Sequence, residues 1–203
     1  MSNTQKKLTA EEISQNWIKF TGLLEKLGDR AEPALDLANT FGERLCCAPA
    51  SARTSFHNCF PGGLVEHSLT VLKNGFKLCK AFDWDVSKES LIIGCLFHDL
   101  GKVGDVNNDY YIPNDSQWHI DKLGELYKIN EEIDYMTVPD RGIFLCQHFG
   151  LKLTRDETLA IKLNDGFILN ENKNYCLKEP LLAHVVMTAD YIATMQEKGA
   201  FPA

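Results

Sequence analysis

Leu91-Ile-Ile-Gly-Cys-Leu-Phe-His98-Asp99-Leu-Gly-Lys102 places seven uncharged, mostly apolar residues directly before an imidazole, a carboxylate and an ammonium group. Such an apolar run, with Ser87 as its N-cap, predicts a helix buried on all sides. Burial of the three polar groups at its end is costly unless they pair or bind a metal. Lys102 follows His98 by four residues and Asp99 by three, so on a helix the three side chains share one side. This grouping predicts a metal ion beside a phosphate.

Length and composition favour one globular domain spanning residues 1–203. Hydrophobic residues make up 44% of the chain and charged residues 24%, which is ordinary for a soluble protein. With 21 basic and 28 acidic residues the net charge is −7. This balance does not suit non-specific binding to nucleic acid or to an anionic membrane. It does permit a small anionic substrate beside a bound cation.

Cysteine usage and hydropathy indicate the compartment. The seven cysteines form an odd set without a C-x-x-C pair, which favours reduced thiols over a disulfide framework. No apolar run approaches the roughly 18 residues of a membrane helix, and the first residues lack an apolar signal core. We therefore expect a cytoplasmic protein without a membrane partner, and the sequence leaves its oligomeric state open.

The hydrophobic periodicity predicts an all-α helical bundle. Thr9-Ala-Glu-Glu12 is a capping box that opens the first helix, and a second helix runs from about Glu32 to Leu45. These two form an N-terminal scaffold within residues 1–48. The later helices are expected over residues 64–82, around 88–102, over 141–148, from the capping box at Thr154 to 165, and over 180–199.

Residues 105–135 are predicted to form an irregular insertion that lies across the site. Turn-forming residues dominate it, and Tyr110-Tyr-Ile112 is typical of a strand. The segments 118–121 and 125–129, which flank Gly124, are expected to form a short β-hairpin. His119 and Lys122 are the insertion's residues best able to contact a substrate.

Two further groups that are costly to bury stand in other apolar helices. His67 lies within the helix expected over 64–82, and Asp190 lies in an apolar turn of the last helix. Alone, His67 would more often be a satisfied core histidine, and a His-Asp pair would more often be a surface ion pair. Together they make a mixed nitrogen and oxygen set, which suits a divalent ion of Mn, Fe, Co, Ni, Zn or Mg. The predicted metal ligands are His67, His98, Asp99 and Asp190.

The loop of residues 46–63 precedes the helix of His67 and carries Pro61 and the pair Gly62-Gly63. Its Arg53, His57 and Asn58 are able to reach the rim of a site on the scaffold, and we expect them to bind substrate. His57 is equally well interpreted as an ordinary surface histidine.

The order His67, His98-Asp99, Asp190 resembles the HD-domain superfamily of metal-dependent phosphohydrolases, over roughly residues 50–195. The resemblance implies a helical bundle with the metal ligands facing its centre, and it defines residues 50–195 as the HD core. Gly-Gly-Leu-Val-Glu-His67, with His57 upstream, looks most like the HD domains of bacterial 3′–5′ oligonucleotide exonucleases and phage-encoded HD hydrolases.

The resemblance also suggests catalytic roles. Many family nucleotidases carry an acid three residues after the aspartate of the motif, where this chain has Lys102. A lysine cannot orient water as a carboxylate does, but it can hold a phosphate oxygen. His119 and His148 resemble the two extra histidines that supply a second metal in dinuclear HD enzymes. Alternatively, they contact the substrate or protonate the leaving oxygen.

The predicted chemistry is metal-assisted hydrolysis. Asp99 would orient the attacking water, and Lys102, helped by Arg53 or Arg141, would offset charge on the phosphoryl oxygens. The net charge favours a small nucleotide as substrate, meaning a nucleoside mono- or triphosphate or a short nucleotide. The local motifs favour 3′–5′ trimming of single-stranded oligonucleotides. Two other classes stay open, a di-iron HD oxygenase and a metal-binding interaction protein without activity.

Overall fold

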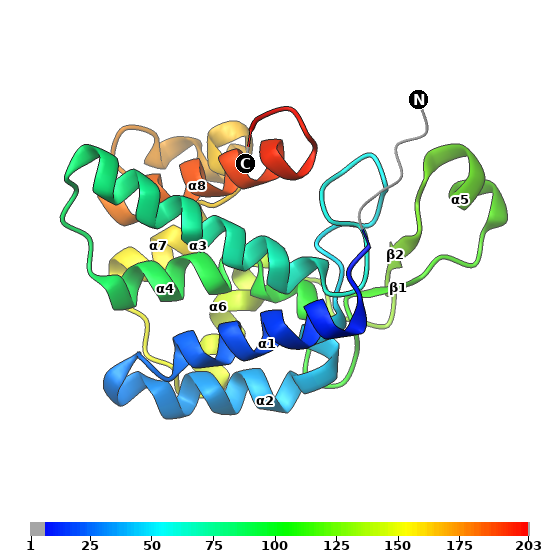
Figure 1. Ribbon diagram of the computed structural model, residues 1–203, viewed down its shortest axis with the longest axis horizontal. Coiled ribbons are helices and arrows are strands. Elements are labelled where there is room, and N and C mark those ends of the chain that lie inside the picture. Colours follow the sequence, from blue (N-terminus) through cyan, green and yellow to red (C-terminus); the bar gives the residue numbers. More distant parts are fainter. Residues whose placement is uncertain (1–6, 203) are drawn as a thin grey trace.

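The protein is a bundle of α-helices with one small hairpin (Figure 1). The computed structural model describes residues 7–202; residues 1–6 of the expected N-terminal segment and residue 203 lie outside the described residues. The helices are α1 (Ala10–Leu24), α2 (Ala31–Cys47), α3 (Gly63–Phe82), α4 (Lys88–Phe97), α5 (Gln117–Leu123), α6 (Val138–His148), α7 (Arg155–Lys162) and α8 (Leu181–Glu197). Four 3-10 turns join them, η1 (Gly28–Arg30), η2 (Leu100–Val103), η3 (Gly166–Ile168) and η4 (Asn170–Tyr175).

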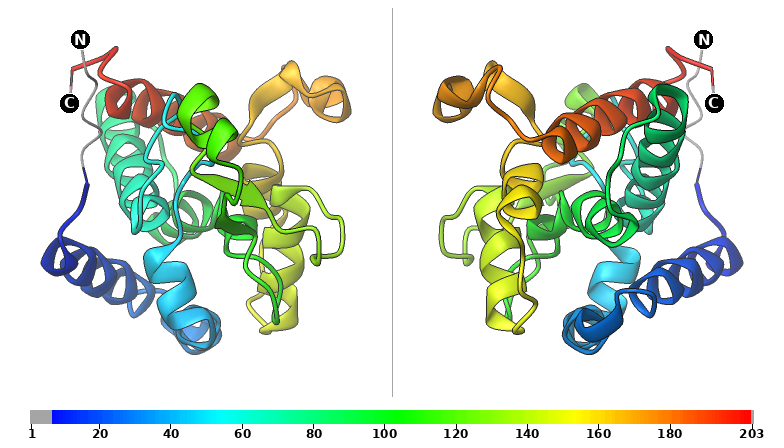
Figure 2. Two further views of the ribbon diagram at one scale, coloured as in Figure 1. Left: turned by 90° about the vertical axis from the view of Figure 1, so that its right-hand side faces the viewer. Right: turned by 90° about the vertical axis from the view of Figure 1, so that its left-hand side faces the viewer.

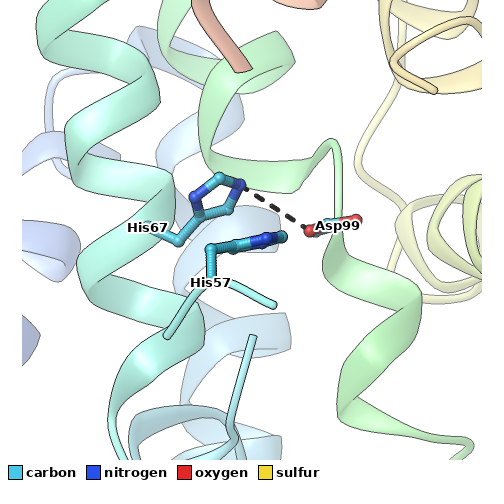
Figure 3. A group of neighbouring side chains, drawn as sticks. All are labelled: His57, His67 and Asp99. Atoms are coloured by element: carbon cyan, nitrogen blue, oxygen red, sulfur yellow. Dashed lines mark ion pairs between the residues drawn. The ribbon is translucent and has the colours of Figure 1, made fainter. Parts of the chain in front are cut away.

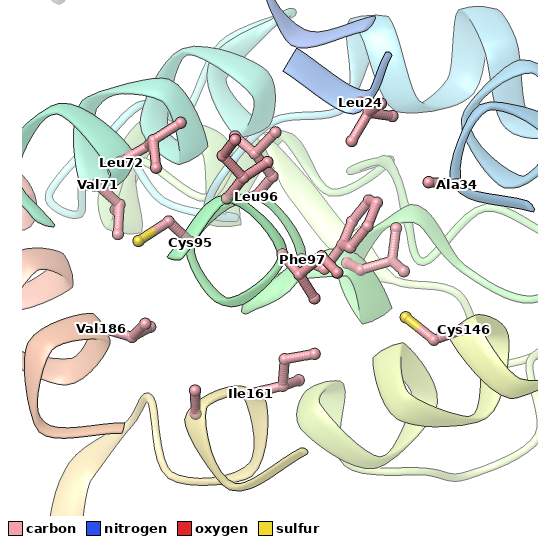
Figure 4. Packing of buried hydrophobic residues seen from close by; sticks show 14 of the residues in the cluster. Leu24, Ala34, Val71, Leu72, Cys95, Leu96, Phe97, Cys146, Ile161 and Val186 are labelled. Atoms are coloured by element: carbon pink, nitrogen blue, oxygen red, sulfur yellow. The ribbon is translucent and has the colours of Figure 1, made fainter. Parts of the chain in front are cut away.

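Helix α4 is the centre of the hydrophobic core. Every residue from 91 to 97 is buried, and the Ser87 hydroxyl accepts a hydrogen bond from the amide of Ser90 as the predicted N-cap. Burying a large apolar side chain contributes about 1.5–3 kcal/mol, so this one helix supplies a large share of the core. Figure 4 shows Cys95, Leu96 and Phe97 of α4 amid side chains from the surrounding helices, including Leu24, Ala34, Val71, Leu72, Cys146, Ile161 and Val186.

The helices that carry the predicted ligands are direct neighbours. Helix α3 packs against both α4 and α8, and α7 packs against α4 and α8 from another side (Figures 1 and 2). His67 of α3, the end of α4 and Asp190 of α8 therefore meet inside the bundle. The expected all-α class is confirmed, and the inward-facing arrangement of the ligands follows from this packing.

The N-terminal helices α1 and α2 pack against each other and against α3. The capping box at Thr9 is present, with the Glu12 carboxylate accepting from the Thr9 amide at 2.8 Å. Trp17 stacks on Phe20, and the Phe20 ring meets the Phe97 ring of α4 edge to face at 6.2 Å. These contacts join the scaffold to the helix that ends at the site.

The insertion contains a two-stranded antiparallel hairpin, but its elements differ from the prediction. Strand β1 (Tyr111–Pro113) pairs with β2 (Tyr127–Ile129), while residues 117–123, part of which was expected to be a strand, form helix α5. Ser116 caps that helix, and Gly124 ends it in the left-handed conformation. Local capping therefore overrides the strand preference of Trp118 and Ile120. No helix among residues 7–202 is long and apolar enough to cross a membrane.

Candidate metal centre

The end of α4 presents the His-Asp pair through a change of backbone direction. The helix ends at Phe97, His98 is its C-cap, and Asp99 (φ −107°, ψ 12°) precedes the 3-10 turn η2. The prediction of one continuous helix through Lys102 is therefore wrong in its last turn. The tighter turn still brings the Lys102 ammonium to 2.6 Å from Asp99 Oδ2.

Four donor atoms from three helices converge at this point. His67 Nε2 lies 2.9 Å from Asp190 Oδ1 and 3.3 Å from His98 Nε2. Asp99 Oδ2 lies 3.5 Å from His98 Nε2 and 3.9 Å from His67 Nε2. Donor atoms bound at about 2.1 Å to one ion lie about 3 to 4 Å apart. His67, His98 and Asp190 therefore form a donor group that could hold a divalent ion, and Asp99 lies within 4 Å of both histidines.

The two histidines are oriented by partners on their other ring nitrogen. His67 Nδ1 lies 2.9 Å from a carboxylate oxygen of Glu197, and His98 Nδ1 lies 2.8 Å from the carbonyl oxygen of Cys95. With the proton on Nδ1, each ring presents its Nε2 lone pair to the centre, as metal-binding histidines do. Glu197 is not among the residues predicted from the sequence. Its position seven residues after Asp190, on the same helical face, was the available signal.

The electrostatics of the centre favour a cation. Burial opposes the charged form of Asp99, but Lys102 and His98 hold the pKa of this carboxyl well below its usual range. Burial also lowers the pKa of His67, yet the carboxylates of Glu197 and Asp190 outweigh it and raise this pKa to about 10. In the metal-free protein His67 is therefore protonated at neutral pH, and its positive charge occupies the position that a divalent ion would take.

His57 lies against the ligands themselves, deeper than the substrate-binding position predicted for it. Its ring centroid is 4.4 Å from that of His67, and Figure 3 shows the ring beside both His67 and Asp99. Its buried Nε2 has no hydrogen-bond partner among the described residues. Burial, with His67 and Lys102 nearby, lowers the pKa of His57 to about 2, so its ring is neutral. His57, His67 and Asp99 form a second donor group that could hold a metal.

Asp165, the N-cap of η3 after α7, is another carboxylate near the centre that the sequence pattern did not single out. Although its side chain reaches solvent, lost hydration and the charges of Asp99 and Asp190 raise its pKa. A Cβ built on the next residue, Gly166, would lie 3.4 Å from Met187 Sδ, and Met187 precedes Asp190 by one turn. In the sequence the Asp165-Gly166 pair signals only a turn.

Three predicted substrate-binding residues have structural partners instead. The Arg141 guanidinium is buried and donates to the carbonyl oxygens of Gly101, Asp134 and Met136. Asn58 is buried with a positive φ of 43°, and its amide donates to the Gly63 carbonyl.

Arg53 pairs with Glu125 at 3.1 Å and so ties the loop to the insertion. These contacts occupy the charged or polar groups of all three side chains in the ligand-free structure, and substrate binding by Arg53, Asn58 and Arg141 stays a prediction.

The two histidines considered for a second metal do not reach the centre. His119 lies on α5 with its ring against Trp118, and Lys122 is exposed on the same helix. His148 ends α6, is exposed, and packs on Phe144 and Phe149. Within residues 7–202 neither histidine belongs to a donor group that could hold a metal. Sequence spacing could not show this, because the insertion and the direction of α6 decide where the two side chains lie.

A hollow of about 300 Å³ is lined by His57 and Lys102, which contact His67 and Asp99 of the centre, and we call it the entrance hollow. Tyr111 of β1 is also among its lining residues, so the insertion borders this hollow. Its lining consists of residues 50–52, Phe56, His57, Lys102, Tyr111, Thr194 and Lys198. A second hollow of about 310 Å³, lined by Tyr110, Tyr111 and Tyr127, adjoins Lys102 from another side.

Comparison with protein families agrees with this geometry. The HD domain model matches residues 64–195, which begin at α3 and extend beyond Asp190. Neither the search of curated proteins nor the search of solved structures gave a significant match. The match spans well over half of the chain and includes His67, His98, Asp99 and Asp190, the four predicted ligands. The chain therefore belongs to the HD domain family, whose members are generally metal-dependent phosphohydrolases.

Proposed function

We propose that this protein is a metal-dependent phosphohydrolase that cleaves a phosphoester or phosphoanhydride bond of a small nucleotide. The observation that carries the proposal is the convergence of four donor atoms, with His67 Nε2 2.9 Å from Asp190 Oδ1, beside a lysine at the end of the entrance hollow. The imidazole and carboxylate donors suit a borderline or hard divalent ion.

The residues around the centre divide the chemistry among them. A divalent ion held by the four side chains supplies Lewis-acid activation of water and of a phosphoryl oxygen. Asp99 has a second carboxylate oxygen that can accept a hydrogen bond from the attacking water. The Lys102 ammonium lies within reach of charge that develops on the phosphoryl oxygens. His57 is neutral, so it serves as a further donor to the ion or to the substrate rather than as an acid.

A small substrate is favoured over a long strand. The entrance hollow has about the smallest volume that small-molecule pockets show. Binding of a long strand needs a positively charged track, whereas this chain has a net charge of −7. The oxygenase alternative needs a six-ligand dinuclear site. Among residues 7–202 the two candidate donor groups share His67 and together contain five residues, His57, His67, His98, Asp99 and Asp190.

The test is turnover in a defined metal. Chelator-treated protein would be supplied in turn with Mn, Co, Ni, Fe, Zn and Mg, and offered nucleoside mono-, di- and triphosphates and short oligonucleotides. We expect phosphate or nucleotide release with at least one metal, and a loss of at least about a hundredfold in Asp99→Asn, more than the loss of an outer partner causes. Asp36→Asn, an exposed carboxylate on α2, is the matched control. Full activity in Asp99→Asn, or no turnover with any metal, would refute the proposal.

A further inference from the structure

The entrance hollow is lined by a lysine, Lys198, that has no role in the hydrolysis proposed above. Lys198, the C-cap of α8, lines the hollow together with Lys102, and no carboxylate is among the lining residues. Lys102 is already paired with Asp99 at 2.6 Å. Lys198 makes no ion pair within the described part of the chain. In a protein of net charge −7, this hollow is a local positive region.

One face of α8 connects this lysine to the metal centre. Thr194 follows Asp190 by four residues, and Lys198 follows Thr194 by four, so the three side chains lie along one side of the helix. Thr194 and Lys198 both line the entrance hollow, while Asp190 Oδ1 lies in the candidate metal centre, 2.9 Å from His67 Nε2. The helix therefore presents a metal ligand, a hydroxyl and an ammonium group in sequence, moving outward from the reacting position.

We propose that Lys198 and Thr194 form a subsite for a second phosphate group, next to the phosphoryl group that is cleaved. The inference rests on the proposed function and names its substrate class: nucleotides with at least two linked phosphates, of which nucleoside di- and triphosphates fit best. Lys102 would contact the reacting phosphoryl group beside the bound ion, and Lys198 would neutralise the next phosphate. A strand with a second phosphodiester offers the same chemistry, but the small hollow favours the compact pyrophosphate group.

A simpler role for Lys198 is also available and makes a different prediction. A lysine at the C-terminus of a helix interacts favourably with the helix dipole wherever it lies. That role affects stability and leaves anion binding unchanged. Lys80 lies in the last turn of α3, three residues before the C-cap Asp83, so it also interacts with a helix C-terminus; it is exposed and lines none of the hollows described above. Lys80→Ala is therefore a matched control for the dipole contribution.

The experiment measures binding of inorganic pyrophosphate and of inorganic phosphate to the full-length, manganese-loaded protein by calorimetry. Wild type, Lys198→Ala, Lys198→Arg and Lys80→Ala are compared at one fixed manganese concentration, so that chelation by pyrophosphate is common to all. We expect Lys198→Ala to weaken pyrophosphate binding roughly tenfold, as expected for the loss of one charge-assisted hydrogen bond, and phosphate binding by less than about twofold. Lys198→Arg should restore most of the affinity, and Lys80→Ala should match wild type.

The outcomes separate this inference from the proposed function. Equal losses for both anions, no loss in Lys198→Ala, or no pyrophosphate binding by wild type would overturn the subsite. A selective loss confirms the subsite whether or not turnover is found. For turnover, Lys198→Ala should raise KM for nucleoside triphosphates and leave KM for monophosphates nearly unchanged. A trinucleotide, which carries two phosphodiesters, affected more strongly than a triphosphate would assign the second phosphate to a strand, and would overturn the stated substrate class.

Discussion

The orientation of two histidine rings decides whether this centre can bind a metal. A Glu197 carboxylate oxygen lies within hydrogen-bond distance of His67 Nδ1, and the Cys95 carbonyl oxygen lies equally close to His98 Nδ1. Both Nε2 atoms therefore face the candidate metal centre. The Cys95 carbonyl comes from the last turn of α4 and is fixed by that helix. The contact with Glu197 instead depends on a side chain, because α8 and α3 must pack in register for it to form.

Replacing Glu197 by glutamine should weaken the metal site without removing a ligand. The amide keeps the shape of the side chain but loses the charge that favours the Nδ1 proton. We expect the dissociation constant for Mn²⁺ to rise by about 10- to 100-fold, measured by calorimetry on chelator-treated protein. Glu131→Gln, an exposed carboxylate of the insertion, is the control. Unchanged metal affinity in Glu197→Gln would show that Glu197 does not position His67.

The raised pKa of His67 predicts how metal binding depends on pH. In the folded, metal-free protein this pKa is about 10, above the ordinary 6.5, because the charges of Glu197 and Asp190 exceed the opposing effect of burial. The stabilisation from protonated His67 is therefore complete below pH 6.5 and is lost as the pH rises through 10. A metal must displace this proton, so its affinity should rise about tenfold per pH unit between pH 7 and 9.

Proton release gives this prediction a direct readout. Calorimetry in two buffers of different ionisation enthalpy should show at least one proton released per bound ion at pH 7.5. Binding without proton release, and with an affinity that does not vary with pH, would contradict the assignment of His67 Nε2 as a ligand.

At the scale of elements, the turn η2 is held against the start of α6 by a close backbone approach. A Cβ on Gly101 would lie 2.0 Å from the carbonyl oxygen of Val138, which is far inside van der Waals contact. Arg141 of α6 reinforces the same contact by donating to the Gly101 carbonyl at 3.2 Å. The position of Lys102, the next residue, therefore depends on a glycine at 101.

Gly101→Ala should shift η2 and destabilise the fold. The added methyl meets backbone rather than a flexible side chain, so we expect a loss of about 1–3 kcal/mol in the free energy of unfolding, measured with urea. Gly22→Ala on α1, where a Cβ would meet nothing within 4 Å, should be neutral or stabilising. A Gly101→Ala variant as stable as wild type would contradict the tight packing of η2 on α6.

Local sequence signals predicted the elements that depend on local interactions. The capping boxes at Thr9 and Thr154 open α1 and α7 as expected, and the apolar run of α4 is buried throughout. Buried polar groups on apolar helices led to the ligand set, because such groups need a partner wherever the helices meet.

Features that depend on tertiary contacts could not be predicted in this way. The contact of Glu197 with His67 requires the packing of α3 on α8. The place of His57 against His67 follows from the path of the preceding loop, in which Asn58 adopts a positive φ. Tertiary contacts also decide the surroundings of Arg141. Its guanidinium donates to the backbone carbonyls of Asp134 and Met136, which the sequence alone could not show.

At the scale of the whole molecule, one buried ion pair joins the scaffold to the core. Arg30 of η1 donates to both carboxylate oxygens of Glu157 on α7, at 2.7 and 2.9 Å, and also reaches Glu89 at the start of α4. The Glu157 side chain is 0% exposed, so its charge has no access to solvent. Breaking such a pair leaves an uncompensated buried carboxylate.

Arg30→Ala should therefore lower the free energy of unfolding by about 3–5 kcal/mol. Arg155→Ala removes an exposed pair with Asp156 on α7 and should cost no more than about 1 kcal/mol. Urea unfolding followed by circular dichroism checks both variants, and a single transition is expected because the pair joins the scaffold to the core. Equal costs for the two arginines would contradict a structural role for the Arg30–Glu157 pair.

The central claim is that four side chains from α3, the end of α4 and α8 hold one divalent ion. Its most direct test is anomalous X-ray scattering from crystals of the protein grown with Mn²⁺. We predict an anomalous peak about 2.1 Å from His67 Nε2, His98 Nε2, Asp99 Oδ2 and Asp190 Oδ1. A fully occupied peak elsewhere, with no density among these four atoms, would contradict it.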